Sequence, residues 1–306
     1  MIIKKSSLAA LFNSLAKKYD FYAPTGESFE RIRSFDEIDF GRKTVYSAKK
    51  IFLPQAEQLF YFANNNTISA KKNIKPIIVF GLRPCDLHGL EYMDEFFRGD
   101  ALYEERRKKI TVLGLQCTKC FKNCFCHLTN TYQSNYYDAL FIEAGDDFFI
   151  DVKSDAAKVI FRNIGHVKAV KESDMNELMS IIKNSFHREG ELKINDAPID
   201  QFSKDCFSCC ACTSVCPTCT CFDITDKPAT ISSGSRTRVW DSCQSQEFTR
   251  VAGDFVFRSD RFSRIKQRIY CKFDYTKRRT GKMSCIGCGR CVDVCTKNIN
   301  IFEVFK

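Results

Sequence analysis

The stretch Cys206-Phe-Ser-Cys209-Cys-Ala-Cys212-Thr-Ser-Val-Cys216-Pro217 has a counterpart near the C-terminal end, Cys285-Ile-Gly-Cys288-Gly-Arg-Cys291-Val-Asp-Val-Cys295. Both follow the spacing C-x2-C-x2-C-x3-C, which is typical of [4Fe–4S] ligation. Where two such runs occur, the fourth cysteine of each run binds the cluster of the other run. Three thiolates on one tight loop reach three corners of a cube, and the fourth ligand must come from elsewhere. The two runs therefore predict two [4Fe–4S] sites.

The predicted first site consists of Cys206, Cys209, Cys212 and Cys295, and the predicted second site of Cys285, Cys288, Cys291 and Cys216. A pair of zinc knuckles is the alternative, because four thiolates suit either metal. Zinc does not explain two matching four-cysteine runs. The small residues Gly287 and Gly289 also fit a backbone that wraps closely around sulfide. The second run has Thr296 where proline is usual, which removes no ligand.

Length and composition allow two domains and exclude several classes of protein. The chain has 306 residues, of which 44% are hydrophobic, and domains commonly hold about 100–200 residues. No apolar run approaches the roughly 20 residues that span a bilayer, and the N-terminal segment lacks the features of a secretory signal. We expect a cytoplasmic protein without membrane contact. In a reducing compartment, 18 cysteines indicate metal binding rather than disulfides.

The positive charge is concentrated in one segment. The formal net charge is +10, and residues 236–282 alone hold 13 Lys and Arg against 5 Asp and Glu, a net of +8. With one Trp and several Phe between the charges, this segment superficially resembles a nucleic-acid surface. Anionic clusters and an acidic partner protein are better counterparts for these charges. We rank partner docking first and predict no nucleic-acid binding.

Hydrophobic patterns predict an α+β or α/β fold: an N-terminal α/β domain over 1–200 and a ferredoxin-like two-cluster domain over 201–306, with a basic insertion at about 222–284. The predicted helices span 7–18, 86–97, 154–162 and 173–188, and the predicted strands span 77–80, 110–115, 139–143 and 147–152. The strand–helix–strand order across 77–115 predicts a parallel pair with a right-handed crossover. Residues 190–201 are the predicted linker.

Cysteines also follow both strands of this parallel pair. Cys85 lies in the loop after the first strand, and the loop after the second strand carries Cys117, Cys120, Cys124 and Cys126. Ligands of open α/β sheets bind beyond the carboxyl ends of the strands, so these thiols should converge. The predicted third site consists of Cys85, Cys117, Cys124 and Cys126, with Cys120 as a spare. From the spacing alone, zinc in the 117–126 loop and a merely buried Cys85 stay open as the alternative.

Five motifs occur along the chain: Arg83-Pro84-Cys85-Asp86, Asn123-Cys124-Phe-Cys126, Cys216-Pro-Thr-Cys219-Thr-Cys221, Trp240-Asp-Ser-Cys243 and Cys285-Ile-Gly-Cys288-Gly-Arg-Cys291. Together they resemble the 4Fe–4S dicluster subunit of anaerobic sulfite reductase. The iron–sulfur β subunit of the soluble [NiFe] sulfhydrogenases is a close relative of that family. The likeness extends from about residue 20 to 302, and the segment from Pro54 to Phe62 resembles the sulfite reductase branch in particular, as does Cys219-Thr-Cys221.

The resemblance implies an electron-carrying subunit with three [4Fe–4S] clusters. Its partners would be a flavin subunit that oxidises NAD(P)H and a sirohaem subunit that reduces sulfite to sulfide. The family's ligands correspond to the twelve cysteines of the three predicted sites, whereas Cys120 and Cys210 are extra here. The alternative is the β subunit of a soluble [NiFe] sulfhydrogenase, and a distant alternative is a zinc-dependent nucleic-acid-binding protein. No substrate chemistry of its own is expected, because bond-making would occur on the partner's cofactor.

Three further cysteines have no predicted role. Cys219, Cys221 and Cys243 belong to the resemblance, but they could line a cluster, bind a further metal or only pack. Of the four histidines, only His127 directly follows a predicted ligand, and it is the one candidate for support of a cluster. No G-x-G-x-x-G loop occurs, so a nucleotide site is not expected on this chain.

Overall fold

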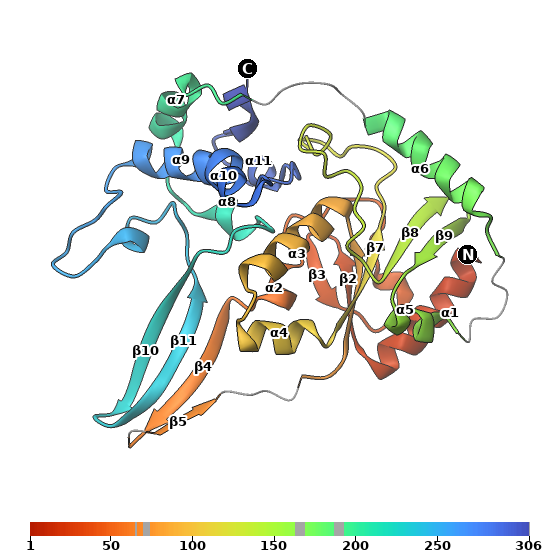
Figure 1. Cartoon of the computed structure of the whole chain (residues 1–306), viewed down its shortest axis with the longest axis horizontal. Coiled ribbons are helices and arrows are strands. Elements are labelled where there is room, and N and C mark those ends of the chain that lie inside the picture. Colours follow the sequence, from red (N-terminus) through yellow and green to blue (C-terminus); the bar gives the residue numbers. More distant parts are fainter. Residues whose placement is uncertain (65, 70–73, 163–168, 187–192, 306) are drawn as a thin grey trace.

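A seven-stranded mixed sheet forms the centre of the computed structural model, which describes residues 1–64, 66–69, 74–162, 169–186 and 193–305 (Figure 1). The four central strands run parallel, and antiparallel strands complete both edges. The strand order is β1 (Ile2–Lys4), β9 (Asp147–Val152), β8 (Ala139–Ala144), β7 (Ile110–Leu115), β6 (Ile77–Leu82), β2 (Asp20–Thr25) and β3 (Ser28–Arg31).

The predicted parallel strand pair is present at the middle of this sheet. β6 is buried over its whole length and pairs in parallel with β7. Helix α3 (Pro84–Phe96) connects the two strands together with α4 (Ala101–Arg107). Proline at the first position of α3 fits there because the first helical N–H needs no partner within the helix. The loops after β6 and β7 therefore lie at the same edge of the sheet.

Each face of the sheet has its own hydrophobic core. On one face, α1 (Lys5–Lys18) and α5 (Asp155–Phe161) pack against the strands, with the Phe12 ring edge-on to Phe21 and Phe80. On the other face, the core includes residues of α2 (Lys49–Phe52), α3, α4 and α6 (Glu172–Phe186). The predicted helices at 7–18, 86–97, 154–162 and 173–188 thus correspond to α1, α3, α5 and α6, with shifts of a few residues at their ends.

A second sheet, of four strands, projects from the body as an arm (Figure 1). Its order is β10 (Phe222–Thr230), β11 (Ser233–Trp240), β4 (Ala56–Ala63) and β5 (Asn66–Ser69), and all its pairs are antiparallel. The arm was not predicted. It joins strands that lie far apart in the sequence, on both sides of the predicted domain boundary at residue 200, and that boundary stays a prediction.

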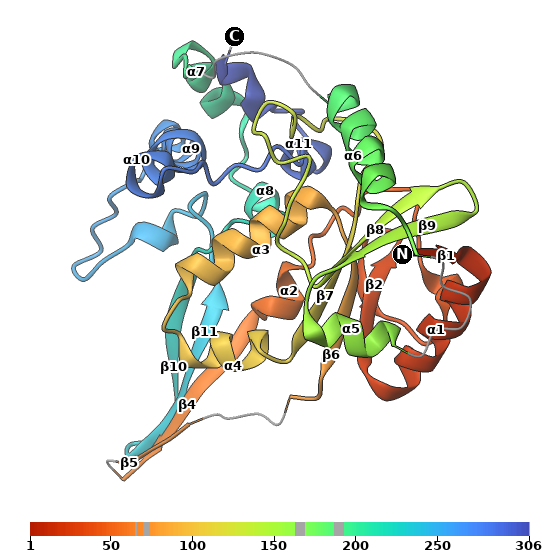
Figure 2. The ribbon, with the colours of Figure 1, turned by 45° about the vertical axis from the view of Figure 1, so that its right-hand side comes forward.

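Short helices make up much of the remaining chain. α7 (Ala197–Asp205), α9 (Arg261–Tyr270) and the final turn η4 (Ile301–Phe305) share a third hydrophobic core. The other elements are η1 (Phe35–Glu37), α8 (Ala211–Ser214), η2 (Glu247–Thr249), η3 (Cys271–Tyr275), α10 (Thr276–Thr280) and α11 (Arg290–Asp293). Figure 2 shows α8 and α11 beside α3. Of the predicted linker 190–201, residues 190–192 lie outside the described residues, and its end forms the start of α7.

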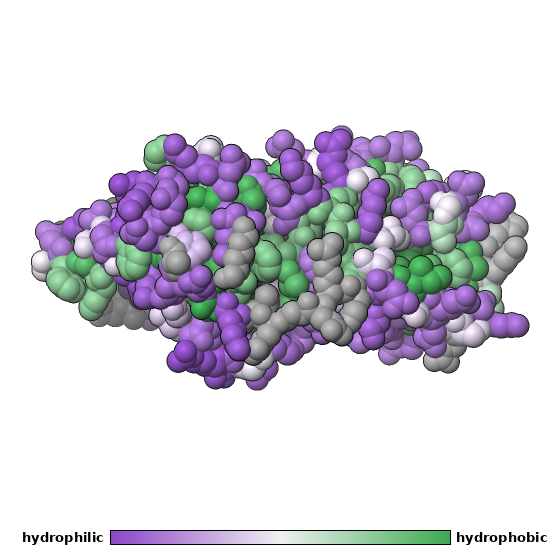
Figure 3. Space-filling model, turned by 90° about the horizontal axis from the view of Figure 1, so that it is seen from above, coloured by the Kyte–Doolittle hydropathy of each residue, from purple (hydrophilic) through white to green (hydrophobic). Residues whose placement is uncertain are grey.

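The surface shown in Figure 3 is mainly hydrophilic, and hydrophobic side chains reach it in separate patches. Among the described residues, no helix combines the length and the apolar character that crossing a bilayer requires. The mixed sheet and the helices confirm an α+β architecture, whereas the ferredoxin-like character of the last hundred residues stays a prediction.

Buried ion pairs fix the arm to the body. Arg238 of β11 lies directly across from Glu57 of β4 and binds its carboxylate, and the second oxygen of Glu57 binds Arg106 of α4. Arg238 also binds Asp100, which caps α4. Only 4% of the Arg238 and Glu57 side chains is exposed. Removal of one partner leaves the others charged and buried without compensation.

We predict that Arg238→Ala lowers the free energy of unfolding by about 3–5 kcal/mol, the usual cost of breaking a buried ion pair. Urea denaturation of the anaerobically purified protein measures this change. Arg236→Ala is the matched control, because Arg236 lies on the same strand and pairs with Asp226 at the surface. Its loss should change stability little. Equal effects of the two variants would contradict the role of the buried pair.

Candidate metal centres

The two cysteine runs have the same local backbone. Ser208 and Cys210 have φ of 56° and 65°, and the residues at the same two positions of the second run, Gly287 and Gly289, have φ of 63° and 71°. A short helix follows in each case, α8 in the first run and α11 in the second. The left-handed conformation bends each loop back on itself, which turns successive cysteines toward a common centre.

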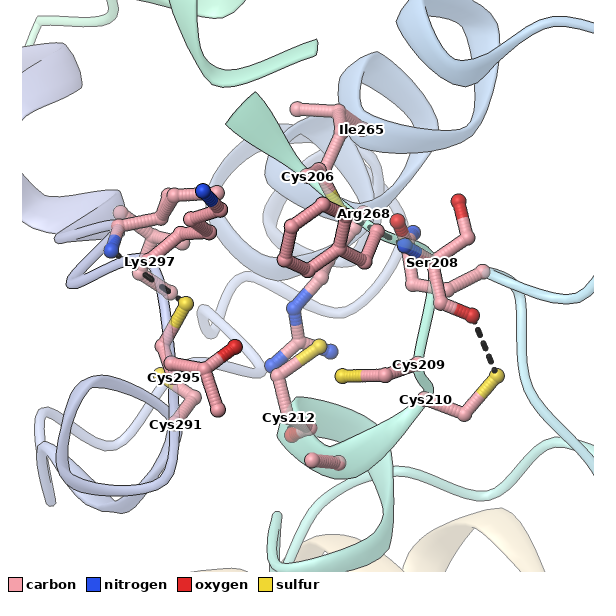
Figure 4. A pocket seen from close by; sticks show the side chains of 16 residues that line it. Cys206, Ser208, Cys209, Cys210, Cys212, Ile265, Arg268, Cys291, Cys295 and Lys297 are labelled. Carbon is pink, nitrogen blue, oxygen red and sulfur yellow. Dashed lines mark hydrogen bonds between the residues drawn. The ribbon is translucent and has the colours of Figure 1, made fainter. Parts of the chain in front are cut away.

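The first cavity has a volume of about 50 Å³ and is lined by all four cysteines of the predicted first site, together with Cys291 and Arg268 (Figure 4). Cys210 lies at its rim, and its thiol points away to donate to the Ser208 carbonyl at 3.5 Å. The extra cysteine of the first run therefore occupies the position of a glycine in the second run.

The second cavity, of about 20 Å³, combines residues of both runs. It is lined by Cys285, Cys288 and Cys291 of the second run and by Cys216 of the first. A hydrogen bond of 2.6 Å from Thr218 Oγ1 to the Ser284 carbonyl holds the two segments together. The exchange of the fourth cysteine between runs, as predicted from the spacing, is thus compatible with both cavities.

The third cavity, also about 20 Å³, lies at the edge of the large sheet where β6 and β7 end. It is lined by the four cysteines of the predicted third site and by Cys120. Cys85 and Cys126 are buried, whereas Cys120 is exposed. The Cys120 sulfur lies 3.9 Å from Nδ1 of His127, the one histidine that directly follows a predicted ligand.

The second and third cavities are in direct contact. A Cβ atom on Gly287 would lie 2.6 Å from the backbone of Cys126, and one on Gly289 would clash with the Asn123 carbonyl oxygen. The Cys124 thiol donates to the Cys288 carbonyl at 3.3 Å. Glycine is required at these positions by the left-handed backbone and by the close approach of residues 123–126. From the sequence, these glycines were expected only to let the backbone wrap closely around sulfide.

Buried cations surround the three cavities. Lys43 Nζ lies 2.6 Å from the Cys288 carbonyl and 3.6 Å from the Cys124 sulfur, and it also pairs with Asp293. Arg268 lines both the first and the second cavity. Arg290 is fully buried beside Cys291 and binds Asp86, the residue after Cys85. Positive charge is therefore placed where thiolate ligands would bring negative charge.

Burial raises the pKa of most of these thiols. It raises the pKa of Cys117 and Cys291 to about 11 and that of Cys212 to about 12, although Arg83 opposes the shift at Cys117 and Arg268 at the other two. Without a metal these thiols are protonated at neutral pH. Because metals bind thiolates, the binding of a metal centre must release protons from this region.

The donor sets fit clusters better than single ions. Nowhere among the described residues do three Cys, His, Asp or Glu side chains converge closely enough to hold one metal ion. A zinc ion needs four donors around one point at about 2.0–2.3 Å, whereas a [4Fe–4S] cluster takes thiolates at its separate corners. Each cavity offers at least four thiols in this spread arrangement.

Comparison with known families decides the nature of the C-terminal part. Residues 205–299 match the family described as a 4Fe–4S dicluster domain. This part of the chain binds [4Fe–4S] clusters. Over 315 aligned residues the chain is 28% identical to sulfhydrogenase 2 subunit beta of Pyrococcus furiosus, and the alignment covers 96% of this chain and 93% of that protein. No solved structure matches the chain. The dicluster domain makes the chain an iron–sulfur protein of electron transfer.

The cations that lie closest to the thiols were not predicted from the sequence. Lys43 and Lys49 lie in a segment without a motif, and nothing in their neighbours indicated a site. Arg264, Arg268 and Lys272 belong to the basic segment that was interpreted as a docking surface, yet all three are buried. One signal was available: Ile265 and Ile269 are spaced four residues apart in α9, and Arg264 and Arg268 are next to them on the same buried face.

For the third site we predict that Cys85→Ser removes about four iron and four sulfide ions per chain, one cluster of the [4Fe–4S] type. Iron and acid-labile sulfide are quantified on anaerobically purified protein. The matched control is Cys120→Ser, because Cys120 lines the same cavity but is exposed and is the predicted spare. Unchanged iron in Cys85→Ser, or an equal loss in both variants, would contradict the ligand assignment.

Proposed function

We propose that this chain is the electron-transfer subunit of a sulfhydrogenase-type complex. In this proposal it exchanges electrons between a flavin subunit that reacts with NAD(P)H and a [NiFe] large subunit. The near full-length similarity to a sulfhydrogenase beta subunit supports the assignment. Three [4Fe–4S] clusters, held by the twelve predicted cysteines, are part of the proposal.

The observation that carries the proposal is the row of thiol-lined cavities. Cys291 and Arg268 line both the first and the second cavity, and Cys124 of the third cavity touches Cys288 of the second. The second cavity is therefore the middle one. A single-substrate enzyme has no need of three adjoining thiol sites, whereas an electron relay does.

When bound, each [4Fe–4S] cluster would accept and release one electron at a potential set by hydrogen bonds, charge and solvent access. The chain controls both the solvent access and the charge at these sites. Cys288 of the second cavity and Cys85 of the third are both buried, which limits the access of water to these thiols. The cations Lys43, Arg268 and Arg290 stabilise additional negative charge beside the thiolates.

The two ends of the row are open to different partners. Cys209 of the first cavity and Cys120 of the third are both exposed. Beside the first cavity, Phe207 is 65% exposed, the Lys297 ammonium lies 4.6 Å from its ring centre, and Arg261 binds the Cys206 carbonyl. An aromatic residue flanked by cations suits a partner with an acidic rim.

Anaerobic sulfite reductase is the second candidate. The segment from Pro54 to Phe62 and the motif Cys219-Thr-Cys221 favour it. Most of the segment from Pro54 to Phe62 lies in β4, a strand of the arm. In that complex the same row of sites would deliver electrons to a sirohaem subunit, so the two candidates differ in the large subunit and not in the chemistry of this chain.

We predict that the tagged chain, purified anaerobically from its own host, brings down a flavin subunit and a [NiFe] large subunit. It should hold at least about twelve iron and twelve sulfide ions, the content of three [4Fe–4S] clusters. NADH or NADPH should reduce these clusters only when the flavin subunit is present, as followed by EPR. Mass spectrometry identifies the large subunit.

Two results would decide against this assignment. A co-purified sirohaem protein would favour the sulfite reductase candidate. A colourless preparation that contains zinc, lacks acid-labile sulfide and binds DNA with steep salt dependence would contradict electron transfer altogether.

A further inference from the structure

Three cysteines outside the predicted sites come together at the base of the arm. Cys221 directly precedes β10 and Cys243 follows β11, so the antiparallel pairing of these strands brings the two residues together. The backbone N–H of Asp241 donates to the Cys221 carbonyl at 3.0 Å. Cys219 lies two residues before Cys221 and is buried. The fold thus gathers three thiols from two segments of the chain.

The side chains of these cysteines interact. Cys221 and Cys243 lie close enough together for each thiol to shift the pKa of the other. Cys219 is close enough to act on the pKa of Cys221 and of Cys216. Gln244 Nε2 also lies 3.6 Å from the Cys243 sulfur. The three thiols therefore form a continuous group next to the second predicted site.

Three buried cations face this group. Arg268 Nη1 lies 3.5 Å from the Cys219 sulfur, and Lys49 Nζ donates to the Cys219 carbonyl at 3.1 Å. Lys272 Nζ donates to the carbonyl and the hydroxyl of Thr218, at 2.9 and 2.8 Å. The exposed fractions of Lys49, Arg268 and Lys272 are 4%, 3% and 4%.

Within the described part of the chain, none of these three cations has a carboxylate partner. Two other enclosed cations do have one, since Arg238 binds Glu57 and Arg290 binds Asp86. Arg83 and Arg264 instead bind carbonyl and hydroxyl oxygens. A buried charge is costly unless an opposite charge accompanies it. Sulfur is the nearest source of compensating charge: Arg268 lines the first and second cavities and also lies 3.5 Å from the sulfur of Cys219, which is outside the twelve predicted ligands.

We propose that Cys219, Cys221 and Cys243 bind a fourth iron–sulfur centre, of the [4Fe–4S] type, at the base of the arm. Their thiolates would supply three ligands and leave one iron open to a further ligand. Zinc fits less well, because these thiols do not converge on one point. The centre would adjoin the middle of the row through Cys216 and thus extend the proposed relay, on which this inference rests, sideways toward the arm.

The test is the iron and acid-labile sulfide content of the full-length protein after anaerobic reconstitution, with Mössbauer spectroscopy to count cluster iron. We expect about sixteen iron ions per chain, four clusters of four. Cys221→Ser and Cys243→Ser should each lower this number by about four. Cys210→Ser is the matched control, because the Cys210 thiol points away from the first cavity, and it should keep all the iron.

The wild-type content decides the matter even where a variant fails to fold. About twelve iron ions per chain, unchanged in both variants, would overturn the fourth centre and leave the proposed relay intact. One zinc ion per chain that is lost in Cys243→Ser would overturn the iron–sulfur assignment. Loss of the second-site signal in Cys219→Ser, with twelve iron ions in the wild type, would mean that Cys219 replaces Cys216 as a ligand there and would overturn the proposal as well.

Discussion

The Arg290 side chain of α11 is fully buried, and both of its terminal nitrogens bind the carboxylate of Asp86 in the first turn of α3. Its Nε and Nη2 also bind the carbonyl and hydroxyl of Thr44. Asp86 follows Cys85, and Arg290 precedes Cys291. This single ion pair therefore fixes a cysteine of the third site relative to the second run. A displacement would leave two buried charges unsatisfied, so the distance between the sites is strongly constrained.

The backbone of the second run adds a steric constraint to this electrostatic one. Gly287 and Gly289 are left-handed and lie against residues 123–126 with no space for a side chain. The first run has the same backbone geometry, and it carries side chains at the equivalent positions, Ser208 and Cys210. The two cysteine runs thus share one backbone conformation but differ in their surroundings. The second run packs against residues 123–126, whereas Cys209 of the first run is exposed to solvent.

Local patterns in the sequence predicted part of the fold and of the cysteine sites. The apolar strands predicted the parallel pair that brings Cys85 near Cys117. The exchange of Cys216 and Cys295 between runs stays a prediction from the cysteine spacing, and both cavities are compatible with it. The arm escaped prediction because it depends on partners distant in sequence: Arg238 and Glu57 are 181 residues apart. The basic segment was misjudged in part, because Arg264, Arg268 and Lys272 are buried. A run of charges gives no sign of which members turn inward.

The buried cations also explain why a protein with many thiols is so basic. In the metal-free protein, Cys212 and Cys291, whose pKa is raised by burial, are neutral at pH 7 and give the neighbouring Arg268 no counter-charge. Thiolates bound to an iron–sulfur core are anionic, and they would compensate this cation. Because ligation adds negative charge beside a buried cation, metal binding contributes to the folding free energy of this region. The net charge of +10 is then the complement of the cofactors rather than only a property of the surface.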